Sequence, residues 1–362
     1  MKVLYIGNYR DGSGWSDACI NNILAMDKIG IDVVPRCVSY SVQHGNPPEK
    51  ILELEKKSSY NCDICIQHVL PDSYVYDSTY KKNIGFLAVE SSNFKDTAWQ
   101  HHANLLDEIW VPSLYSKAAC RRSGITVPIH VVPHSLDINQ YLNAQFTKKI
   151  VELENTFNFL FIGEFIERKN ISALIKAFHT EFDMTEPVNL MIKTSRQNID
   201  YINNYSESIK RGLKIRTSYK KEIIICGKLN KNDYLSVIKQ CHCFVMPSRA
   251  EGFCIPALEA MALGLPVIHA SNTGMDDFSY GIKVMSRTTP CFGAVDTIPF
   301  LDNAHSDWSE IDIRSLMIAM RNYYMKWNTV EAKNDTHNAI EKAKLYSHQS
   351  VGTTIKDLLN DC

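Results

Sequence analysis

Short apolar runs alternate along this chain with longer stretches in which apolar residues recur at helical spacing. The apolar runs have the length of buried strands and are bounded by turn residues. Helices are predicted between them, for example from a cap at Ser16 to a stop at Gly30. This alternation predicts an α/β fold with doubly wound sheets. The predicted strands lie at 3–6, 31–34, 63–67, 83–89, 159–163, 190–192, 223–226, 243–246 and 266–270, with two more in the segments 107–113 and 131–137 that are joined by a helix at 115–123.

The β–α pattern runs through the chain twice. A polar and charged segment at 145–158 separates the two series and indicates an interdomain linker. No tandem repeat of short period is present. We therefore expect two Rossmann-like domains that face each other across a cleft, one at 1–148 and one at 149–345.

The stretch 243–277 carries the most informative chemistry. It predicts a strand, a loop that contains Gly252, a helix that begins at Pro256, and a further strand. A helix N-terminus after such a loop binds phosphate, because its free N–H groups and its dipole favour negative charge. Glu259 is suited to hydrogen-bonding ribose hydroxyls, and Glu251 to a sugar or to positive charge developing at a sugar carbon. The alternative is that both acids only stabilise a helix N-terminus.

Polar residues also stand at the predicted strand ends of the first half. Gly14 belongs to a glycine-containing loop after the first strand, His68 ends the strand at 63–67, and Glu90 ends the strand at 83–89. Side chains at these ends project into the ligand crevice of a doubly wound sheet. Ordinary turn glycines and a structural histidine are the alternative interpretations.

Three segments together resemble a known family. The pattern P-S-x-x-E-G-F-x-x-P-x-L-E-A-M-A-x-G-x-P-V at 247–267 resembles the signature of glycosyltransferase family 4, whose members are retaining enzymes with the GT-B fold. The segments D-E-I-W-V-P-S at 107–113 and V-V-P-H-S-L-D at 131–137 are similar to further segments of that family. The resemblance extends from the first strand to about Asp277.

The resemblance implies roles for particular residues. Glu251 would contact the donor sugar and Glu259 the ribose, and Gly14 would face the donor phosphate. Domain 1–148 would hold the acceptor and domain 149–345 the nucleotide sugar, with the last helix, at 346–362, packing back on the first domain. Donor-loop positions are also implied for Phe253, Cys254 and Ile255.

The family pattern G-R-x-x-x-x-K corresponds to 163–169, where its Arg and Lys neutralise the donor diphosphate. Lys169 matches the Lys, Arg168 lies beside it, and Glu164 replaces the Arg. Cations there would stabilise the departing diphosphate. The missing charge could come from Arg168, or from Lys193 or Arg196 after the next strand.

Two further positions depart from the family. Cys254 replaces a Gly, and Glu90 stands where many members carry a His beside the reacting sugar. His68 and Glu90 are therefore predicted to act on the acceptor side, without the role of that histidine being assigned to either.

Composition places the chain among globular proteins with 45% hydrophobic and 22% charged residues. A net charge of −1 gives no general attraction to nucleic acid, so no nucleic-acid partner is expected. No apolar run approaches the ~20 residues of a membrane span, and the N-terminus does not resemble a signal peptide. Basic residues crowd 210–221 and predict a solvated face, with peripheral contact to an anionic lipid surface as the alternative.

Eleven cysteines suit free thiols in a reducing cytoplasm better than a disulfide framework. The C-x-x-C pair at 62–65 and the Cys-His-Cys run at 241–243 have the spacing of metal or redox sites. Both lie in or beside predicted buried strands, which favours structural thiols.

These observations predict a cytoplasmic, metal-independent, retaining glycosyltransferase, since no Asp-x-Asp pair is available to hold a metal. Its co-substrate would be a nucleotide sugar, with no further cofactor, and its acceptor a glycan, a lipid-linked glycan or a protein. The departures from the family pattern favour one alternative, a GT-B subunit that binds a nucleotide sugar or a partner without turnover. A further alternative is another kind of enzyme that uses the same cleft, such as a phosphorylase or a nucleotide-sugar epimerase.

Overall fold

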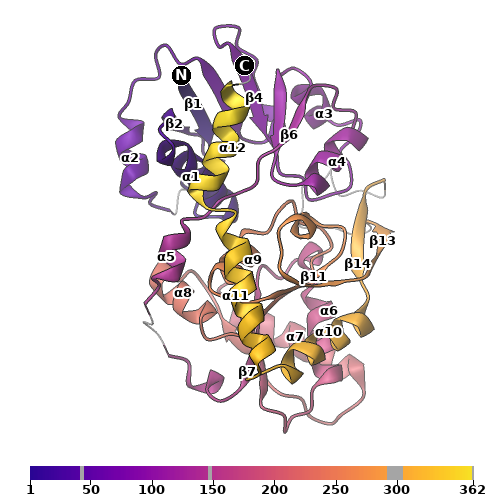
Figure 1. The fold of residues 1–362 in the computed structure, drawn as a ribbon. Helices are drawn as coiled ribbons and strands as arrows, with labels where there is room; N and C mark the ends of the chain where they lie inside the picture. Colours follow the sequence, from indigo (N-terminus) through magenta and orange to yellow (C-terminus); the bar gives the residue numbers. More distant parts are fainter. Residues whose placement is uncertain (41–44, 146–148, 292–304, 361–362) are drawn as a thin grey trace. The chain divides into compact units, whose positions relative to one another are not determined.

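A computed structural model of the chain describes residues 1–40, 45–145, 149–291 and 305–360. The chain divides into two compact units (Figure 1). Unit 1 comprises residues 1–138 and 345–362, and unit 2 comprises residues 139–344. The division precedes the polar segment at 145–158, because the short helix α5 (Ile138–Leu142) carries Tyr141, whose hydroxyl donates a hydrogen bond to Glu259 of unit 2.

Unit 1 is built on a six-stranded parallel sheet in the order β2-β1-β3-β4-β5-β6. The first five positions follow the flavodoxin-like order of doubly wound folds. Its strands are β1 (Lys2–Gly7), β2 (Asp32–Cys37), β3 (Ile64–His68), β4 (Lys82–Phe86), β5 (Glu108–Val111) and β6 (Ile129–Val131). Its helices are α1 (Gly14–Lys28), α2 (Glu49–Glu55), α3 (Ala98–Ala103), α4 (Leu114–Arg122) and α12 (His348–Asn360).

The apolar strand residues of unit 1 pack against its helices. Val3 pairs in register with Val33 and with Ile64, and all three are buried. Helix α12, from the end of the chain, packs along α1, and a Cβ added to Gly352 would lie 2.4 Å from the carbonyl oxygen of Ala25. A glycine is therefore required at this close approach.

Two sequence predictions for unit 1 are corrected by the structure. Helix α1 is capped by Ser13 rather than Ser16, because the Ser13 hydroxyl accepts a hydrogen bond from the Ser16 N–H at 3.3 Å. Strand β4 ends at Phe86, so the predicted strand at 83–89 is too long and Glu90 lies in the loop that follows.

Unit 2 has a second six-stranded parallel sheet, in the order β12-β11-β10-β7-β8-β9. Counted from β7, this is the 3-2-1-4-5-6 order of the Rossmann fold. The strands are β7 (Phe157–Ile162), β8 (Val188–Lys193), β9 (Ile223–Ile225), β10 (Cys243–Met246), β11 (Val267–Ala270) and β12 (Gly281–Val284). The helices are α6 (Ile171–Glu181), α7 (Ile199–Leu213), α8 (Lys231–Ile238), α9 (Ile255–Ala262), α10 (Ile313–Met325) and α11 (Val330–Lys344).

Unit 2 also contains an antiparallel pair that the sequence did not predict, β13 (Ser286–Pro290) with β14 (Asp307–Ile311). Trp308 of β14 packs with Cys291 and Ala250 in a small apolar cluster.

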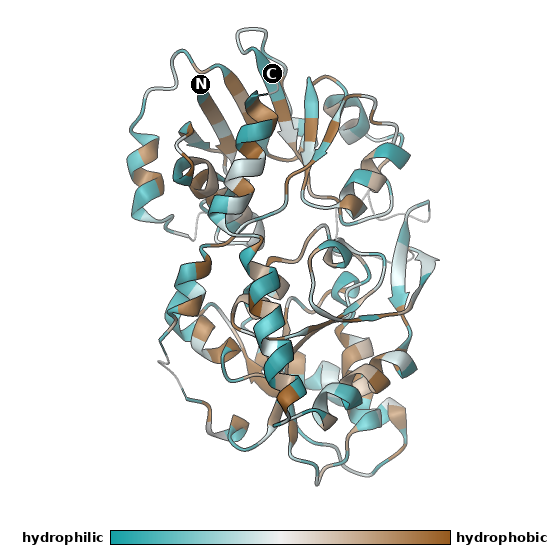
Figure 2. Ribbon diagram, viewed as in Figure 1, coloured by the Kyte–Doolittle hydropathy of each residue, from teal (hydrophilic) through white to brown (hydrophobic). Residues whose placement is uncertain are grey.

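Figure 2 shows that the helices of each unit carry polar residues on part of their surface while apolar residues gather on the strands. The inner strands β3, β5, β10 and β11 are fully buried, as expected of parallel sheets, whereas the edge strands β9 and β12 are partly exposed.

The basic residues at 210–221 do not form a uniformly solvated face. Lys210 is 1% exposed, and its Nζ lies 3.1 Å from a carboxylate oxygen of Glu222. Arg216 donates hydrogen bonds to the carbonyl oxygens of His179 and Phe182, at 2.9 and 2.6 Å. The predicted solvated face is wrong for Lys210, which is buried, and Arg216 is only partly exposed. The other predicted residues Arg211, Lys214 and Lys221 are exposed as expected.

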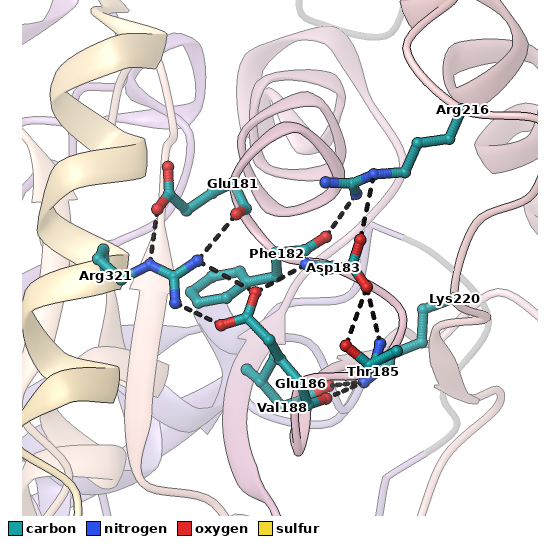
Figure 3. Close-up of polar contacts among 9 residues, drawn as sticks. All are labelled: Glu181, Phe182, Asp183, Thr185, Glu186, Val188, Arg216, Lys220 and Arg321. Carbon is teal, nitrogen blue, oxygen red and sulfur yellow. Dashed lines mark hydrogen bonds and ion pairs between the residues drawn. The ribbon is translucent and has the colours of Figure 1, made fainter.

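Arg321 of α10 and the basic segment hold the loop between α6 and β8 from two sides (Figure 3). The Arg321 guanidinium lies 2.6 Å from Glu181 and 2.5 Å from Glu186, and 4.4 Å from the centroid of the Phe182 ring. Lys220 donates to the carbonyl oxygens of Glu186 and Val188. The short loop is therefore fixed by charge-assisted hydrogen bonds rather than by apolar packing alone.

Candidate functional site

The candidate site in unit 2 lies where the strand order reverses. β7 and β10 are neighbours, and from them the chain proceeds to β8 on one side and to β11 on the other. Ligands of doubly wound sheets bind outside the carboxyl ends of the strands at such a switch point. Lys169 follows β7 and Glu251 follows β10, so the fold places both residues at this point.

A short 3-10 helix, η3 (Glu167–Lys169), positions the cations that follow β7. Lys169 Nζ lies 2.6 Å from Glu251 Oε1, and the Arg168 guanidinium lies 3.4 Å from the same oxygen. Arg168 also donates to the carbonyl oxygen of Ala250 at 2.7 Å. The Ser248 hydroxyl donates to Glu251 Oε1 at 2.5 Å. The sequence-predicted residues of these two loops are thus brought together.

The Glu251 carboxylate is only 2% exposed. Its burial alone would raise its pKa, but the Lys169 and Arg168 charges outweigh burial and hold the pKa of Glu251 below its ordinary value. Glu251 is therefore ionised at neutral pH. A buried carboxylate held this way can stabilise positive charge on a bound ligand, while the adjacent cations can bind negative charge.

Glu259 of α9 is held by three side chains from elsewhere in unit 2. Its Oε1 accepts from the Tyr141 hydroxyl at 2.5 Å and from Lys231 Nζ at 2.9 Å, and its Oε2 accepts from the Tyr234 hydroxyl at 2.6 Å. Burial raises its pKa, but the Lys231 charge and these hydrogen bonds leave the pKa below its ordinary value. A carboxylate has about four acceptor positions, and these three hydrogen bonds use most of them.

The start of helix α9 explains why a glycine would suit position 254. Cys254 precedes the helix with φ +86, in the left-handed region that glycine adopts without strain. The side chain is buried, and this burial raises the pKa of its thiol to about 12. Ile255 begins the helix, with Pro in the first turn as predicted. Cys254 is therefore a strained residue at the entrance to the predicted phosphate site.

The loop before α9 is fixed by further contacts. The Phe253 ring stacks on Phe278 with centroids 4.3 Å apart. The Gly274 N–H donates to the carbonyl oxygen of Glu251 at 2.8 Å, and a Cβ on Gly274 would lie 2.2 Å from the carbonyl oxygen of Gly252. Sequence reasoning missed Gly274, although a glycine soon after the strand at 266–270 is a visible signal for close backbone approach.

Lys193 was predicted to supply a cation to the site, but its amine is bonded to backbone carbonyl oxygens instead. It is 6% exposed, and its Nζ donates to the carbonyl oxygens of Thr194 and Gly227 at 2.9 and 2.5 Å. Burial lowers its pKa. In this structure Lys193 therefore fixes the loops after β8 and β9.

Glu164, which stands where the family pattern has Arg, accepts hydrogen bonds from the residues that follow β8. It accepts from the Ser195 N–H at 3.0 Å and from the Thr194 hydroxyl at 3.3 Å. The Arg196 Nε lies 3.7 Å from the same carboxylate, and the Arg196 side chain remains 36% exposed. Glu164 therefore holds Arg196 beside the end of β7, where a cation was expected.

The predicted residues of unit 1 occupy a separate switch point, between β1 and β3 of that unit. His68 ends β3 and is 2% exposed, with its Nδ1 2.6 Å from the Tyr5 hydroxyl and its ring 4.4 Å from the Phe86 ring. Burial, with His134 nearby, lowers the pKa of His68 well below its ordinary value. This neutral, packed ring fits the structural interpretation better than acid–base chemistry.

Gly14 and Glu90 are both on the surface of unit 1. Gly14 is the first residue of α1, and a Cβ added there would meet no atom within 4 Å. Its local structure therefore does not require glycine. Glu90 is exposed in the loop after β4.

The cysteine pairs that suggested metal or redox sites are buried free thiols. Across residues 1–40, 45–145, 149–291 and 305–360, no group of three or more His, Cys, Asp or Glu side chains is arranged to hold a metal ion. Within the same described part of the chain, every helix is too short or too polar to cross a membrane.

Sequence comparison finds relatives for part of the chain. Residues 143–278 match the family model for glycosyl transferases group 1. A serotype-specific mannosyltransferase WbdA of Escherichia coli is 32% identical over 113 residues, which is 30% of this chain and 13% of that protein. An uncharacterized glycosyltransferase of Methanocaldococcus jannaschii is 28% identical over 132 residues, 36% of this chain and 33% of that protein. The chain thus matches only a small part of these relatives' length.

Solved structures match the whole chain in fold. Anabaena HepE in complex with UDP and glucose has a TM-score of 0.67 at 14% identity, with 100% of both chains covered. A sucrose-phosphate synthase from Thermosynechococcus elongatus has a TM-score of 0.65 at 14% identity, with 100% of this chain and 98% of that chain covered. The chain therefore has the two-domain GT-B fold, and its second unit contains a region similar to the group 1 glycosyl transferases.

Proposed function

We propose that this protein is a retaining glycosyltransferase of family 4 that moves a sugar from a nucleotide-sugar donor bound by unit 2. The observation that carries the proposal is the buried Glu251 carboxylate, kept ionised by Lys169 and Arg168 at the switch point of a Rossmann-order sheet. This arrangement lies within residues 143–278, the region that matches group 1 glycosyl transferases.

The proposed reaction breaks the bond between the sugar C1 and the diphosphate oxygen, and the bonding electrons leave with the diphosphate. An acceptor hydroxyl oxygen bonds to C1 on the same face, and its proton passes to the departing phosphate oxygen. Lys169 and the N–H groups at the start of α9 would stabilise the growing negative charge. Glu251 would hold the sugar and stabilise positive charge at C1, while Glu259 would accept a hydrogen bond from the ribose.

Arg196 is the cation we propose in place of the family Arg at position 164. Arg168 and Lys193 are almost fully buried and donate to backbone carbonyl oxygens, whereas the Arg196 side chain is 36% exposed and near Glu164. A guanidinium at that place can bind a phosphate oxygen with two parallel hydrogen bonds.

The comparisons support a nucleotide-sugar donor without identifying it. HepE has been seen with UDP and glucose, and the similar E. coli proteins are named mannosyltransferases. We propose a glycan, a lipid-linked glycan or a protein as acceptor, with the exposed Glu90 on the acceptor side and the buried His68 as a packed structural residue of that side. Metal independence, a cytoplasmic location and peripheral membrane contact remain predictions from the sequence.

The function is tested with a panel of UDP-, GDP-, ADP- and dTDP-sugars. One donor should raise the melting temperature of the purified protein, because a ligand that binds only the folded state stabilises it by mass action. The same donor should release free nucleotide slowly, both with and without EDTA. A panel in which no donor binds and none is hydrolysed would contradict the proposal.

A binding subunit without turnover is the second candidate. It is favoured by the three protein partners already on Glu259 and by the strained Cys254 at the start of α9. Tight binding of one donor with no nucleotide release in the presence of any acceptor would support this candidate instead.

A further inference from the structure

Arg249 belongs to the loop that follows β10, two residues before Glu251, and its backbone bonds this loop to η3 and to β14. Its N–H donates to the carbonyl oxygen of Arg168 at 2.8 Å. Its own carbonyl oxygen accepts from the Ser309 N–H at 2.8 Å. The main chain at Arg249 is therefore bonded to η3 on one side and to β14 on the other.

The Arg249 side chain makes a second set of links between the same segments. Its Nε lies 2.5 Å from a carboxylate oxygen of Glu310, and one terminal nitrogen lies 2.7 Å from the Glu167 carboxylate. That nitrogen also donates to the Glu167 carbonyl oxygen. The guanidinium lies 5.9 Å from the centroid of the Trp308 ring. With 15% of the side chain exposed, these charge-assisted bonds are partly shielded from water.

Glu310 extends the link to the far end of η3. Its other carboxylate oxygen accepts from the Asn170 side chain at 3.3 Å. Asn170 is 3% exposed and has φ +50, so the chain turns sharply at this residue before α6 begins. The segment that carries Arg168 and Lys169 is therefore held both before it, at Glu167, and after it, at Asn170.

We infer that Arg249 and Glu310 are a positioning pair for the transfer reaction, which hold η3 against the loop of Glu251 so that Lys169 stays in contact with that carboxylate. The inference rests on the proposed function. Neither residue is assigned a contact with donor or acceptor, and β14 acts as the support that brings Glu310 to the site. Ala250, beside Glu251, packs with Trp308 of β14, so the support is apolar as well as ionic.

Loss of the Arg249 side chain would leave the carboxylates of Glu167 and Glu310 without their shared cation. Their mutual repulsion would move η3, and with it Lys169, away from Glu251. A displacement of about 1 Å in a catalytic group can cost about 100-fold in rate. The effect should therefore appear in turnover per folded molecule rather than only in stability.

The test compares Arg249→Met, Arg249→Lys and Glu310→Gln with Arg314→Met, which removes an exposed arginine shortly after β14. We expect kcat per folded molecule to fall about 10- to 100-fold in Arg249→Met and in Glu310→Gln, with partial recovery in Arg249→Lys. The acid limb of the pH profile should move to higher pH, because Glu251 loses its contact with Lys169, one of the two cations that lower its pKa. Arg314→Met should leave both kcat and the acid limb unchanged.

Variants that fold and keep the wild-type kcat and the wild-type acid limb would overturn the inference. If Arg249→Met does not fold, Arg249→Lys and Glu310→Gln decide the question. A wild-type protein that hydrolyses no donor would instead count against the proposed function. Crystal structures then test the positioning separately: a Lys169 Nζ to Glu251 Oε1 distance unchanged from 2.6 Å in Glu310→Gln would overturn it, and a lengthened distance would support it.

Discussion

Lys169 Nζ and Glu251 Oε1 are 2.6 Å apart, although the two residues lie 82 positions apart in the chain. The contact joins the loop after β7 to the loop after β10, and one partner is almost fully buried. A buried carboxylate needs a paired cation, since an unpaired buried charge is costly. The pair therefore makes each loop depend on the other for its position.

Glu251→Gln should separate binding from turnover. The amide keeps the shape of the side chain but removes the charge that would stabilise a positive sugar carbon. We expect nucleotide release from the donor to fall by about 100- to 1,000-fold, with nucleotide affinity retained or increased because Lys169 loses its anionic partner. Steady-state kinetics and titration calorimetry measure the two effects. Glu331→Gln, at a side chain that is 72% exposed, is the control and should change neither. Equal loss of binding and turnover would argue against this role.

Arg196→Met should weaken donor binding, whereas Lys193→Met should lower the stability of unit 2. Arg196 is exposed beside Glu164, so its loss should raise the donor KM about tenfold, the effect of losing about 1.4 kcal/mol of binding, and leave stability unchanged. Lys193 is buried on two carbonyl oxygens, so its loss should destabilise unit 2 by about 1–3 kcal/mol. Donor kinetics and urea unfolding distinguish the two. A larger kinetic effect at Lys193 than at Arg196 would reverse the assignment.

The sequence predicted the fold and the motif loops because both depend on local patterns. Apolar runs specify buried parallel strands, and the segment at 247–267 places Glu251 before α9 and Glu259 within it. The partners of Glu259 were not predicted, because Tyr141 and Lys231 are 118 and 28 positions away and carry no local signal. Only the folded arrangement brings their side chains together.

The basic segment at 210–221 shows a second feature that the sequence pattern did not predict. A run of cations is usually solvated, yet Lys210 is buried against Glu222, and Arg216 caps the end of α6 through backbone carbonyls. Similarly, composition did not predict β14, although it supports both Arg249 and Ala250. In each case the position of a side chain or strand depends on hydrogen bonds to carbonyl and carboxylate groups that only the tertiary fold brings near.

Cys254→Gly should stabilise the protein. A non-glycine residue at φ +86 is strained, and glycine adopts this conformation freely, so we expect a gain of about 1 kcal/mol in the free energy of unfolding. Differential scanning fluorimetry measures the shift in melting temperature. Cys226→Gly is the control: Cys226 has no left-handed φ, so extra backbone freedom should lower the melting temperature. A fall in the melting temperature of Cys254→Gly would show that the buried thiol contributes more than the strain costs.

Glu222 should make unit 2 sensitive to acid. Its side chain is 3% exposed and contacts His179, Ser206 and Lys210 at 2.5, 2.6 and 3.1 Å. Although burial opposes the charged form, these partners lower its pKa from 4.5 to about 2. A lowered folded-state pKa gives stability that is complete above the unfolded pKa and is lost as pH falls. We therefore expect about 3 kcal/mol of unfolding free energy to disappear between pH 4.5 and 2.

Urea unfolding of the full chain at several pH values measures this loss, with Glu222→Gln as the test variant. The variant should be less stable at pH 7 by about 3 kcal/mol, because the buried Lys210 loses its buried carboxylate partner and keeps only the exposed Glu207. Its stability should also change less than that of the wild type as pH falls below 4.5. Glu207→Gln removes the other carboxylate on Lys210, which is 51% exposed, and should cost at most about 1 kcal/mol. If the two variants lose the same stability, the buried position of Glu222 is not what makes its ion pair important.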